Sequence, residues 1–317
     1  MMQEVHSEAT LQVGSSAKIQ RDKLTVILPT LNEEQAIGPL IDELQSSGYS
    51  NIILVDGHSS DRTVAIAREK GIQVMVQHGS GKRDALETAF RSVNTQFLLV
   101  MDADMTYAPR DIESFLEHAN DFDEVIGARD FNANMPRLHK LGNGILTFAF
   151  NIFFGTKLRD VCSGMYLMRT NLARKLDFIG SRLAVEETIA VQTAMYGRVT
   201  DVPIDYRKRI GREPSTQTWR QGFVDLLTIF DLTRRYNPIM LFSAFSALAF
   251  IPALIILAYT AIQNYAFKTY LSGTALLGVM LLLFATQGIA VATLSFQIRR
   301  IEKMLRESRE IGYTGAP

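Results

Sequence analysis

The sequence is poor in cysteine and histidine and has no excess of either charge. Its one cysteine, Cys162, excludes an intrachain disulfide and is typical of a reducing compartment. The 33 basic and 33 acidic residues balance, and no RNA- or DNA-binding motif is present, so nucleic acid is not an expected partner. The five histidines show no metal-ligand spacing. The first 22 residues are polar and lack an apolar core, which predicts that there is no cleaved secretory signal.

Long uncharged stretches, in contrast, fill much of the C-terminal part. Residues 237–265 and 269–298 contain no charged side chain, and each run exceeds the roughly 20 residues that span a bilayer as a helix. We predict two transmembrane helices, at about residues 238–263 and 270–297. Arginines 234 and 235 precede the first helix, and a basic tail (299–317) follows the second. This bias predicts that the domain before the two helices and both termini are cytoplasmic.

Strand-like and helix-like patterns alternate through the preceding part of the chain. Short apolar runs bounded by polar residues read as buried strands, and the longer segments between them read as helices. Such alternation predicts βαβ units and therefore an α/β fold with a mostly parallel sheet covered by helices on both faces. The predicted strands are Leu24–Leu28, Ile52–Val55, Gln73–Val76, Phe97–Met101 and Glu124–Ala128.

Two carboxylates, Asp102 and Asp104, directly follow the most apolar of these predicted strands. The carboxyl ends of strands in α/β folds are where ligands bind. Because two acids this close repel each other, their juxtaposition favours a cation between them and another anion. A divalent metal on a nucleotide diphosphate fits this description, although a solvated turn at a strand end would carry the same residues.

Polar residues also follow the other predicted strands. The first strand leads into Pro29, Asn32 and Glu33, and the second ends at Asp56. A glycine turn then precedes Lys82, whose ammonium group can meet phosphate. The spacing and the ending differ from those of a P-loop. Together these residues predict a nucleotide site at one edge of one sheet.

The chain resembles the family 2 glycosyltransferases with a GT-A fold, and among them the dolichyl-phosphate (polyprenyl-phosphate) sugar synthases. The resemblance runs from about residue 24 to residue 211 and extends to the paired C-terminal helices. The segments that carry it are Leu28–Glu33, Val55–Gly57 with Ser60–Thr63, Gly81-Lys82, Asp102–Asp104, Gly127–Arg129, Asp160–Gly164 and Tyr206–Gly211.

This resemblance implies a Rossmann-like GT-A catalytic domain that uses a nucleotide-sugar donor such as GDP-mannose or a UDP-hexose. It implies that Asp102 and Asp104 bind Mg²⁺ or Mn²⁺. It also implies a nucleotide-sugar site formed by Pro29, Asn32, Glu33, Asp56, Lys82, Asp84 and Asp102.

Two departures from the family pattern concern this site. Some relatives follow the acid pair with Leu-Gln, where this chain has Met105-Thr106, so the third protein ligand of the metal stays open. Many carry a second Asp where this chain has Gly57.

The expected acceptor is a dolichyl or polyprenyl phosphate. A phosphate monoester is already an anionic nucleophile near neutral pH, so the enzyme needs cations to hold it rather than a general base. The reaction would be one in-line displacement with inversion. The resemblance favours Arg129 and Arg209 as catalytic phosphate-binding residues beside Asp104. Further candidates for the lipid phosphate are Arg137, Lys140 and Ser163, and the first two could equally be membrane-surface charges.

The predicted plan is a polar tail (1–22), a GT-A domain (23–216), an interfacial amphipathic helix (217–236), the two transmembrane helices within 237–298 and the cytoplasmic tail. The oily segment Leu138–Phe154 would also lie at the lipid interface or, alternatively, form a buried helix. Because of these apolar segments, membrane lipid is an expected partner. Two membrane helices per chain also suit a homo-oligomer.

Two alternatives stay open at this stage. One is a glycosyltransferase that acts on a different membrane lipid; a hydroxyl acceptor would require a base, for which Glu186 and Glu187 are candidates. The other is a non-catalytic scaffold that keeps the fold. Gln217–Gln221 departs from the Gln-x-x-Arg-Trp signature of polysaccharide polymerases at its last residue, which argues against a polymerase.

Overall fold

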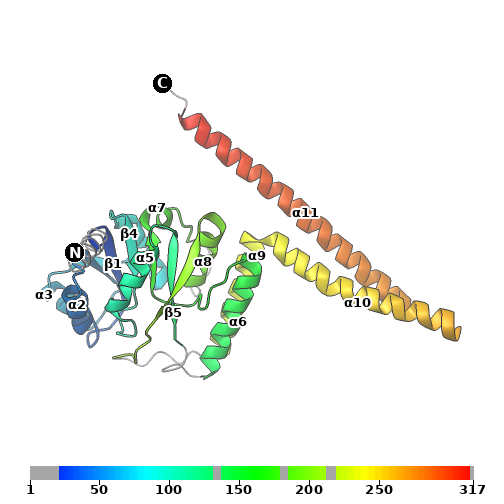
Figure 1. The fold of residues 1–317 in the computed structure, drawn as a ribbon. Helices are drawn as coiled ribbons and strands as arrows, with labels where there is room; N and C mark the ends of the chain where they lie inside the picture. Colours follow the sequence, from blue (N-terminus) through cyan, green and yellow to red (C-terminus); the bar gives the residue numbers. More distant parts are fainter. Residues whose placement is uncertain (1–20, 131–136, 179–184, 212–218, 315–317) are drawn as a thin grey trace, which may run out of the picture. The chain divides into compact units, whose positions relative to one another are not determined.

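A computed structural model of the chain describes residues 21–130, 137–178, 185–211 and 219–314. The chain forms two compact units, Met1–Ile229 and Phe230–Pro317. The first contains an α/β sheet with its helices, and the second contains two long helices (Figure 1).

A seven-stranded sheet runs through the first unit in the order β3-β2-β1-β4-β6-β5-β7. β1 pairs in parallel with β2 and β4, β2 pairs in parallel with β3, and β5 pairs in parallel with β7. Only β6 runs antiparallel to its neighbours β4 and β5, so the predicted mostly parallel α/β sheet is confirmed. The strands are β1 (Leu24–Thr30), β2 (Ile52–Asp56), β3 (Gln73–Val76), β4 (Phe97–Val100), β5 (Glu124–Arg129), β6 (Tyr166–Arg169) and β7 (Val199–Ile204).

Helices connect and cover these strands. α2 places its apolar residues three and four positions apart, so that they form one face, and this face packs in the same core as alternate residues of β1. The described helices that precede residue 237 are α2 (Ile37–Ser46), α3 (Thr63–Glu69), α4 (Lys82–Ser92), α5 (Ile112–His118) after the short 3-10 turn η1 (Pro109–Asp111), α6 (Arg137–Phe154), α7 (Thr170–Ala173), α8 (Val185–Tyr196) and α9 (Trp219–Tyr236).

The strand directions bring several chain segments to one edge of the sheet. β1, β2 and β4 are parallel, so the segments that follow them meet at their shared carboxyl edge. β6 begins at that edge, because Tyr166 lies opposite Val100. β5 and β7 also end there, since β5 is antiparallel to β6 and parallel to β7. The segments around Arg129, before β6 and after Ile204 therefore all reach the edge that carries the acid pair.

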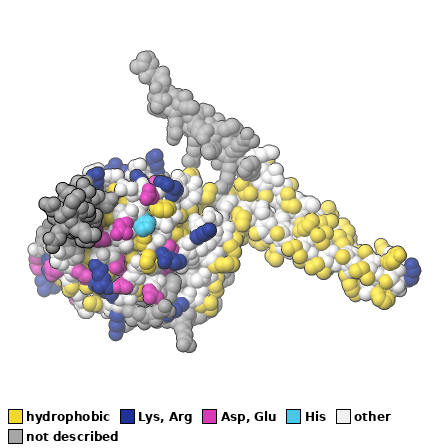
Figure 2. Space-filling model, viewed as in Figure 1, with side chains coloured by type: hydrophobic (Ala, Val, Ile, Leu, Met, Phe, Trp, Pro, Cys, Tyr) yellow, Lys and Arg dark blue, Asp and Glu magenta, His cyan; other side chains and the backbone are white. Residues whose placement is uncertain are grey.

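The second unit is a pair of packed helices, α10 (Pro238–Phe267) and α11 (Ser272–Thr314). Both are long and apolar enough to cross a membrane, and only 22% and 17% of their most apolar windows are buried. Hydrophobic side chains dominate the described surface of α10 and of α11 up to Ile298 (Figure 2). A Cβ built on Gly278 would lie 2.9 Å from Leu257, which shows how closely the two helices approach. The exposure of the apolar side chains distinguishes this pair from core helices of a soluble protein and supports membrane association.

One buried carboxyl in the first unit gives a prediction about stability. Glu124 at the start of β5 is 1% exposed, and no hydrogen-bond partner for its Oε2 lies within the described residues. Burial raises its pKa from 4.5 to about 8. Between these two values the unfolded chain releases a proton that the folded chain keeps. The stabilisation by the neutral carboxyl is therefore complete below pH 4.5 and is lost as the pH rises to about 8.

Replacement of Glu124 by Gln should remove this dependence, because the amide stays neutral. We expect Glu124→Gln to be more stable than the wild type at pH 9, by a few kcal/mol (on the order of 3), and to differ little at pH 5. Thermal unfolding of both proteins in detergent at the two pH values measures the difference. The same substitution at exposed Glu69, on α3, should leave the pH dependence of the melting temperature unchanged. An equal stability gap at both pH values would contradict this account of Glu124.

Candidate active site

The acid pair lies in the loop that follows β4. The Asp104 Oδ1 accepts hydrogen bonds from both the backbone N–H (3.0 Å) and the hydroxyl of Thr106. Met105 between them has a φ of 68°, in the left-handed region that non-glycine residues seldom adopt. Asp104 is 8% exposed as a residue. The loop therefore holds this carboxylate in a defined orientation, with the Thr106 hydroxyl donating to it.

A segment after β7, residues 205–211, crosses this loop; we call it the strap. Its Tyr206 forms a β-bridge with Tyr107, and its backbone N–H groups at Arg207 and Ile210 donate to the carbonyls of residues 106 and 104. Arg209 of the strap forms ion pairs with Asp104 (3.0 Å) and with Glu33. The strap thus brings a guanidinium group against one of the two acids.

Glu33 lies behind that guanidinium, in the loop after β1. Burial raises its pKa to about 7, the positive charge of Arg209 opposes this shift, and the negative charges of Asp104 and Asp102 add to it. Its Oε2 and the Nε of Arg209 are both buried, and neither has a hydrogen-bond partner within the described part of the chain. Buried polar atoms are rarely left unpaired. These two atoms therefore mark a position where a polar ligand group would be stabilised.

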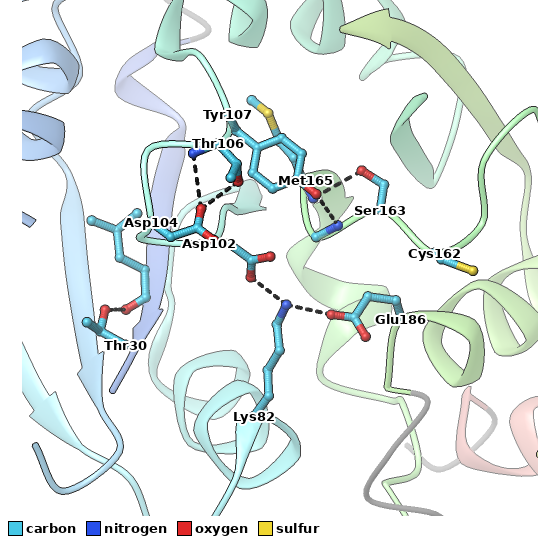
Figure 3. Close-up of polar contacts among 12 residues, drawn as sticks. Thr30, Lys82, Asp102, Asp104, Thr106, Tyr107, Cys162, Ser163, Met165 and Glu186 are labelled. Atoms are coloured by element: carbon cyan, nitrogen blue, oxygen red, sulfur yellow. Dashed lines mark hydrogen bonds and ion pairs between the residues drawn. The ribbon is translucent and has the colours of Figure 1, made fainter. Parts of the chain in front are cut away.

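The other acid of the pair has a different cation. The Lys82 ammonium, at the start of α4, lies 2.5 Å from Asp102 Oδ1 and 2.5 Å from Glu186 Oε1 of α8 (Figure 3). Burial lowers the pKa of Lys82, but the two carboxylates outweigh this and raise it well above its usual value. Lys82 is thus held in its charged form between two acids.

The predicted nucleotide-binding residues lie at the same edge. Asn32 has a φ of 56°, and its side-chain oxygen accepts from Ser60 N (2.8 Å), which ties the loops after β1 and β2 together. Asp56 accepts from the N–H groups of residues 58 and 59, and Asp84 accepts from Ser80 N (2.8 Å). Pro29 stands opposite Val55 in the register of β1 and β2. Asp56 and Asp84 therefore shape their own loops.

Arg129, expected at a phosphate, is held inside the fold. Its guanidinium forms a two-pronged ion pair with Asp160 (2.6 and 3.0 Å) and donates to the Cys162 carbonyl (3.0 Å). It also lies 5.5 Å from the centre of the Tyr206 ring, which belongs to the strap. Asp160 is fully buried, and its charge needs this partner. In this structure Arg129 supports the loop before β6 and the strap.

The remaining predicted lipid-phosphate residues lie on two elements. Ser163 is buried in the loop before β6, where its Oγ accepts from Met165 N (3.4 Å). Lys140 is half-buried on α6. Arg137 begins the same helix, but its side chain lies outside the described residues. The structure does not bring Lys140 into contact with the acid pair through any described interaction.

The residues around the acid pair fit a divalent cation by their chemistry. Carboxylate oxygens are the ligands that Mg²⁺ and Mn²⁺ prefer. Lys82 and Arg209 currently neutralise Asp102 and Asp104, and in the part of the chain that the structure describes no three acidic, His or Cys side chains gather as a ready metal cluster. The carboxylates of Asp102 and Asp104 are therefore suitable ligands for a divalent cation, and in this structure they pair with Lys82 and Arg209.

Sequence reasoning missed two partners in this site. From the sequence, Glu186 is a candidate base for a hydroxyl acceptor; in the structure its carboxylate pairs with Lys82. Asp160 was noted only as part of a motif, and it is the counter-ion of Arg129. Both ion pairs join residues far apart in the sequence, so no local pattern predicts them. The acidic first turn of α8 marks Glu186 as a charged residue at a helix start, but it does not identify Lys82 as its partner.

Gly164 controls the position of Asp102. A Cβ built on this residue would lie 2.7 Å from the Asp102 Cγ, well inside van der Waals contact, and the Gly164 N–H donates to the Tyr107 hydroxyl (2.8 Å). We expect Gly164→Ala to displace the Asp102 carboxylate and to lower the catalytic rate about 100-fold. Steady-state kinetics of the variant and the wild type measure this loss.

A matched control is available on α6. A Cβ on Gly142 would meet nothing within 4 Å, and alanine there should keep activity and add about 0.5–1 kcal/mol of helix stability. If Gly164→Ala retained wild-type kinetics, the position of Asp102 would not matter for catalysis.

Comparison with known proteins agrees with this geometry. Residues 25–177 match the model of a protein family described as glycosyl transferase family 2. A dolichyl-phosphate hexose transferase of Haloferax volcanii is 32% identical over 60% of this chain and 85% of its own length. The glycosyltransferase AglJ of the same organism is 28% identical over 89% of this chain and 98% of its own length.

A solved structure shares the fold. Glucosyl-3-phosphoglycerate synthase of Mycobacterium tuberculosis, crystallised with Mn²⁺, uridine-diphosphate-glucose and phosphoglyceric acid, aligns with a TM-score of 0.55 and 20% identity. The alignment covers 66% of this chain and 79% of that one.

Proposed function

Because this chain belongs to glycosyl transferase family 2, we propose that it transfers one sugar from a nucleotide sugar to a polyprenyl phosphate at the cytoplasmic face of a membrane. The protein is a glycosyltransferase; the acceptor, the orientation and the donor are parts of the proposal. The product would be a lipid-linked sugar that serves as a donor for glycosylation.

The observation that carries the proposal is the charge arrangement around the acid pair in a chain that also has two apolar helices. Asp102 and Asp104 stand at the carboxyl edge of the sheet, with Lys82 and Arg209 beside them. Two cations and two acids at one point suit a reaction that brings two phosphate-bearing substrates together. The helices α10 and α11 would anchor the chain in a membrane, which is where a lipid phosphate is presented.

Asp102 and Asp104 would hold Mg²⁺ or Mn²⁺, which when bound neutralises the leaving nucleoside diphosphate. Arg209 offers a guanidinium fork that matches phosphate oxygens. Lys82 offers a point charge beside Asp102. Since a phosphate monoester is already ionised, no side chain has to remove a proton from it. Lys82 and the acid pair would hold the donor diphosphate, and Arg209 would hold the acceptor phosphate in line with the sugar carbon.

α6 supports a lipid-facing position of the catalytic unit. Its exposed large apolar side chains recur three and four residues apart and therefore form one stripe along the helix. Such a stripe is stable when it lies against lipid. These side chains are Leu141 (62% exposed), Ile145 (50%), Phe148 (67%) and Ile152 (44%). We propose α6 as an interfacial helix, and Lys140 on it as a contact to lipid headgroups.

A transfer assay tests the proposal directly. Purified full-length protein in lipid micelles is incubated with polyprenyl phosphate, Mn²⁺ and a panel of radiolabelled nucleotide sugars. We expect label from one donor to enter the organic phase and to be lost on chelation. The absence of label with every donor would contradict the proposed acceptor.

The same assay separates the alternative acceptors. With a hydroxyl-bearing membrane lipid, transfer would need a base, so Glu187→Gln would abolish it. With polyprenyl phosphate, this variant should keep its activity. Glu187 is 6% exposed, so circular dichroism should accompany the measurement to check the fold of the variant.

A further inference from the structure

We infer that Lys82 and Glu186 form an internal counter-ion pair that competes with the divalent cation for Asp102. Lys82 neutralises Asp102 before the cation binds, and Glu186 holds the lysine once the cation has taken its place. Glu186 is thus a positioning residue that acts through Lys82. The inference rests on the proposed function, because that function places the cation on Asp102 and Asp104.

The contacts of Lys82 support this exchange. Its Nζ lies 2.5 Å from both Asp102 Oδ1 and Glu186 Oε1, so the lysine can leave one acid while it still contacts the other (Figure 3). The side chains of Lys82, Asp102 and Glu186 are 29%, 33% and 17% exposed. In such partly buried surroundings a charge without a partner is costly. A second acid within reach removes that cost when a cation takes the first.

The same pattern recurs at the second acid. Arg209 contacts both Asp104 and Glu33, so each metal-binding candidate has a protein cation that is shared with a further carboxylate. With all carboxylates ionised, the four acids Glu33, Asp102, Asp104 and Glu186 and the two cations sum to a net charge of −2 (two minus four). One divalent cation balances this charge while Lys82 stays on Glu186 and Arg209 stays on Glu33.

Electrostatics predicts opposite effects for the two members of the pair. The lysine repels an incoming cation and occupies its ligand, so its removal should tighten cation binding. The glutamate draws the lysine away, so its removal should weaken cation binding. α8 presents Glu186 in its first turn, and α4 presents Lys82 in its own first turn, so both side chains start from fixed backbone. The exchange therefore needs only a side-chain movement.

Mn²⁺ titration of the full-length protein in detergent, followed by electron paramagnetic resonance of the free ion and without nucleotide, tests this inference. We expect Lys82→Met to tighten Mn²⁺ binding about tenfold and Glu186→Gln to weaken it about fivefold. Lys82→Arg, which keeps the positive charge beside Asp102, should stay within about twofold of the wild type. The double variant Lys82→Met/Glu186→Gln should bind Mn²⁺ more tightly than the wild type. Glu186 acts only through Lys82, so its loss has little effect once the lysine is absent.

In the transfer assay, Lys82→Met should change activity in the opposite direction to its Mn²⁺ affinity. Lys82→Met should lose transfer activity although it binds Mn²⁺ more tightly, because the same ammonium then no longer meets the donor phosphates. A general structural defect would instead weaken both.

Three results would overturn the inference. One is unchanged Mn²⁺ affinity in Lys82→Met. Another is a double variant as weak as Glu186→Gln, which would make Glu186 a direct ligand. A wild type that binds no Mn²⁺ would overturn the metal-dependent function together with the inference, whereas the first two results leave that function standing.

Discussion

Replacement of Asp104 by Asn should lower kcat/KM for sugar transfer about 1,000-fold while the protein stays folded. Asparagine has nearly the same shape, and its side-chain oxygen can still accept from the Thr106 N–H. It lacks the charge that pairs with Arg209 and that would bind the cation. The loss should therefore concern catalysis far more than stability. The labelled-sugar assay measures it, with the melting temperature recorded for the same sample.

Asp205→Asn is the matched control for this prediction. Asp205 begins the strap, but its side chain is exposed and pairs with Arg110 on the surface. This variant should keep activity within about twofold, because an exposed ion pair contributes little. Retention of more than a tenth of wild-type activity by Asp104→Asn would exclude the acid pair as the centre of the reaction.

The second large effect concerns stability. Arg129→Met should lower the free energy of unfolding by about 3–5 kcal/mol, because it leaves the fully buried Asp160 without its cation. An exposed ion pair is the matched control: the side chains of Arg110 and Asp205 are 65% and 58% exposed. Arg110→Met should cost less than about 1 kcal/mol. Urea unfolding of the full-length variants in detergent measures both.

The same variant decides between two roles of Arg129. If the guanidinium mainly supports the fold, removal of both partners in Arg129→Met/Asp160→Leu should recover part of the stability and part of the activity, since no buried charge is then left alone. If Arg129 binds the acceptor phosphate directly, Arg129→Met would lose activity at nearly wild-type stability. The second result would restore the role that the resemblance implied.

The strands with strong local signals were predictable, and the two without them were not. β1, β2 and β4 are mostly apolar and almost entirely buried, as expected for strands covered on both faces. β6 has only four residues and pairs with both its neighbours in the antiparallel direction. β7 contains Pro203, which argues against a strand, and it is tolerated because β7 lies at the edge of the sheet.

The acids of the site were predictable, but their ion-pair partners were not. Asp102 and Asp104 follow a clear strand signal and were correctly placed at the carboxyl edge. The charges that neutralise them depend on which helices and loops reach that edge, and this is set by tertiary packing. Arg129 illustrates the same limit, since its partner Asp160 lies on a segment that only the antiparallel β6 brings close.

The strap also has a consequence for the order of synthesis. Arg209 and Glu33 are 176 residues apart in the chain, and Arg207 of the strap is 164 residues from its partner Glu43. While the chain emerges from the ribosome, both acids of the pair are present long before the strap exists. A nascent chain that ends near residue 177, where the family match ends, would carry the acid pair without the guanidinium of Arg209. The site is therefore completed late in translation, immediately before the two long apolar helices α10 and α11 are made.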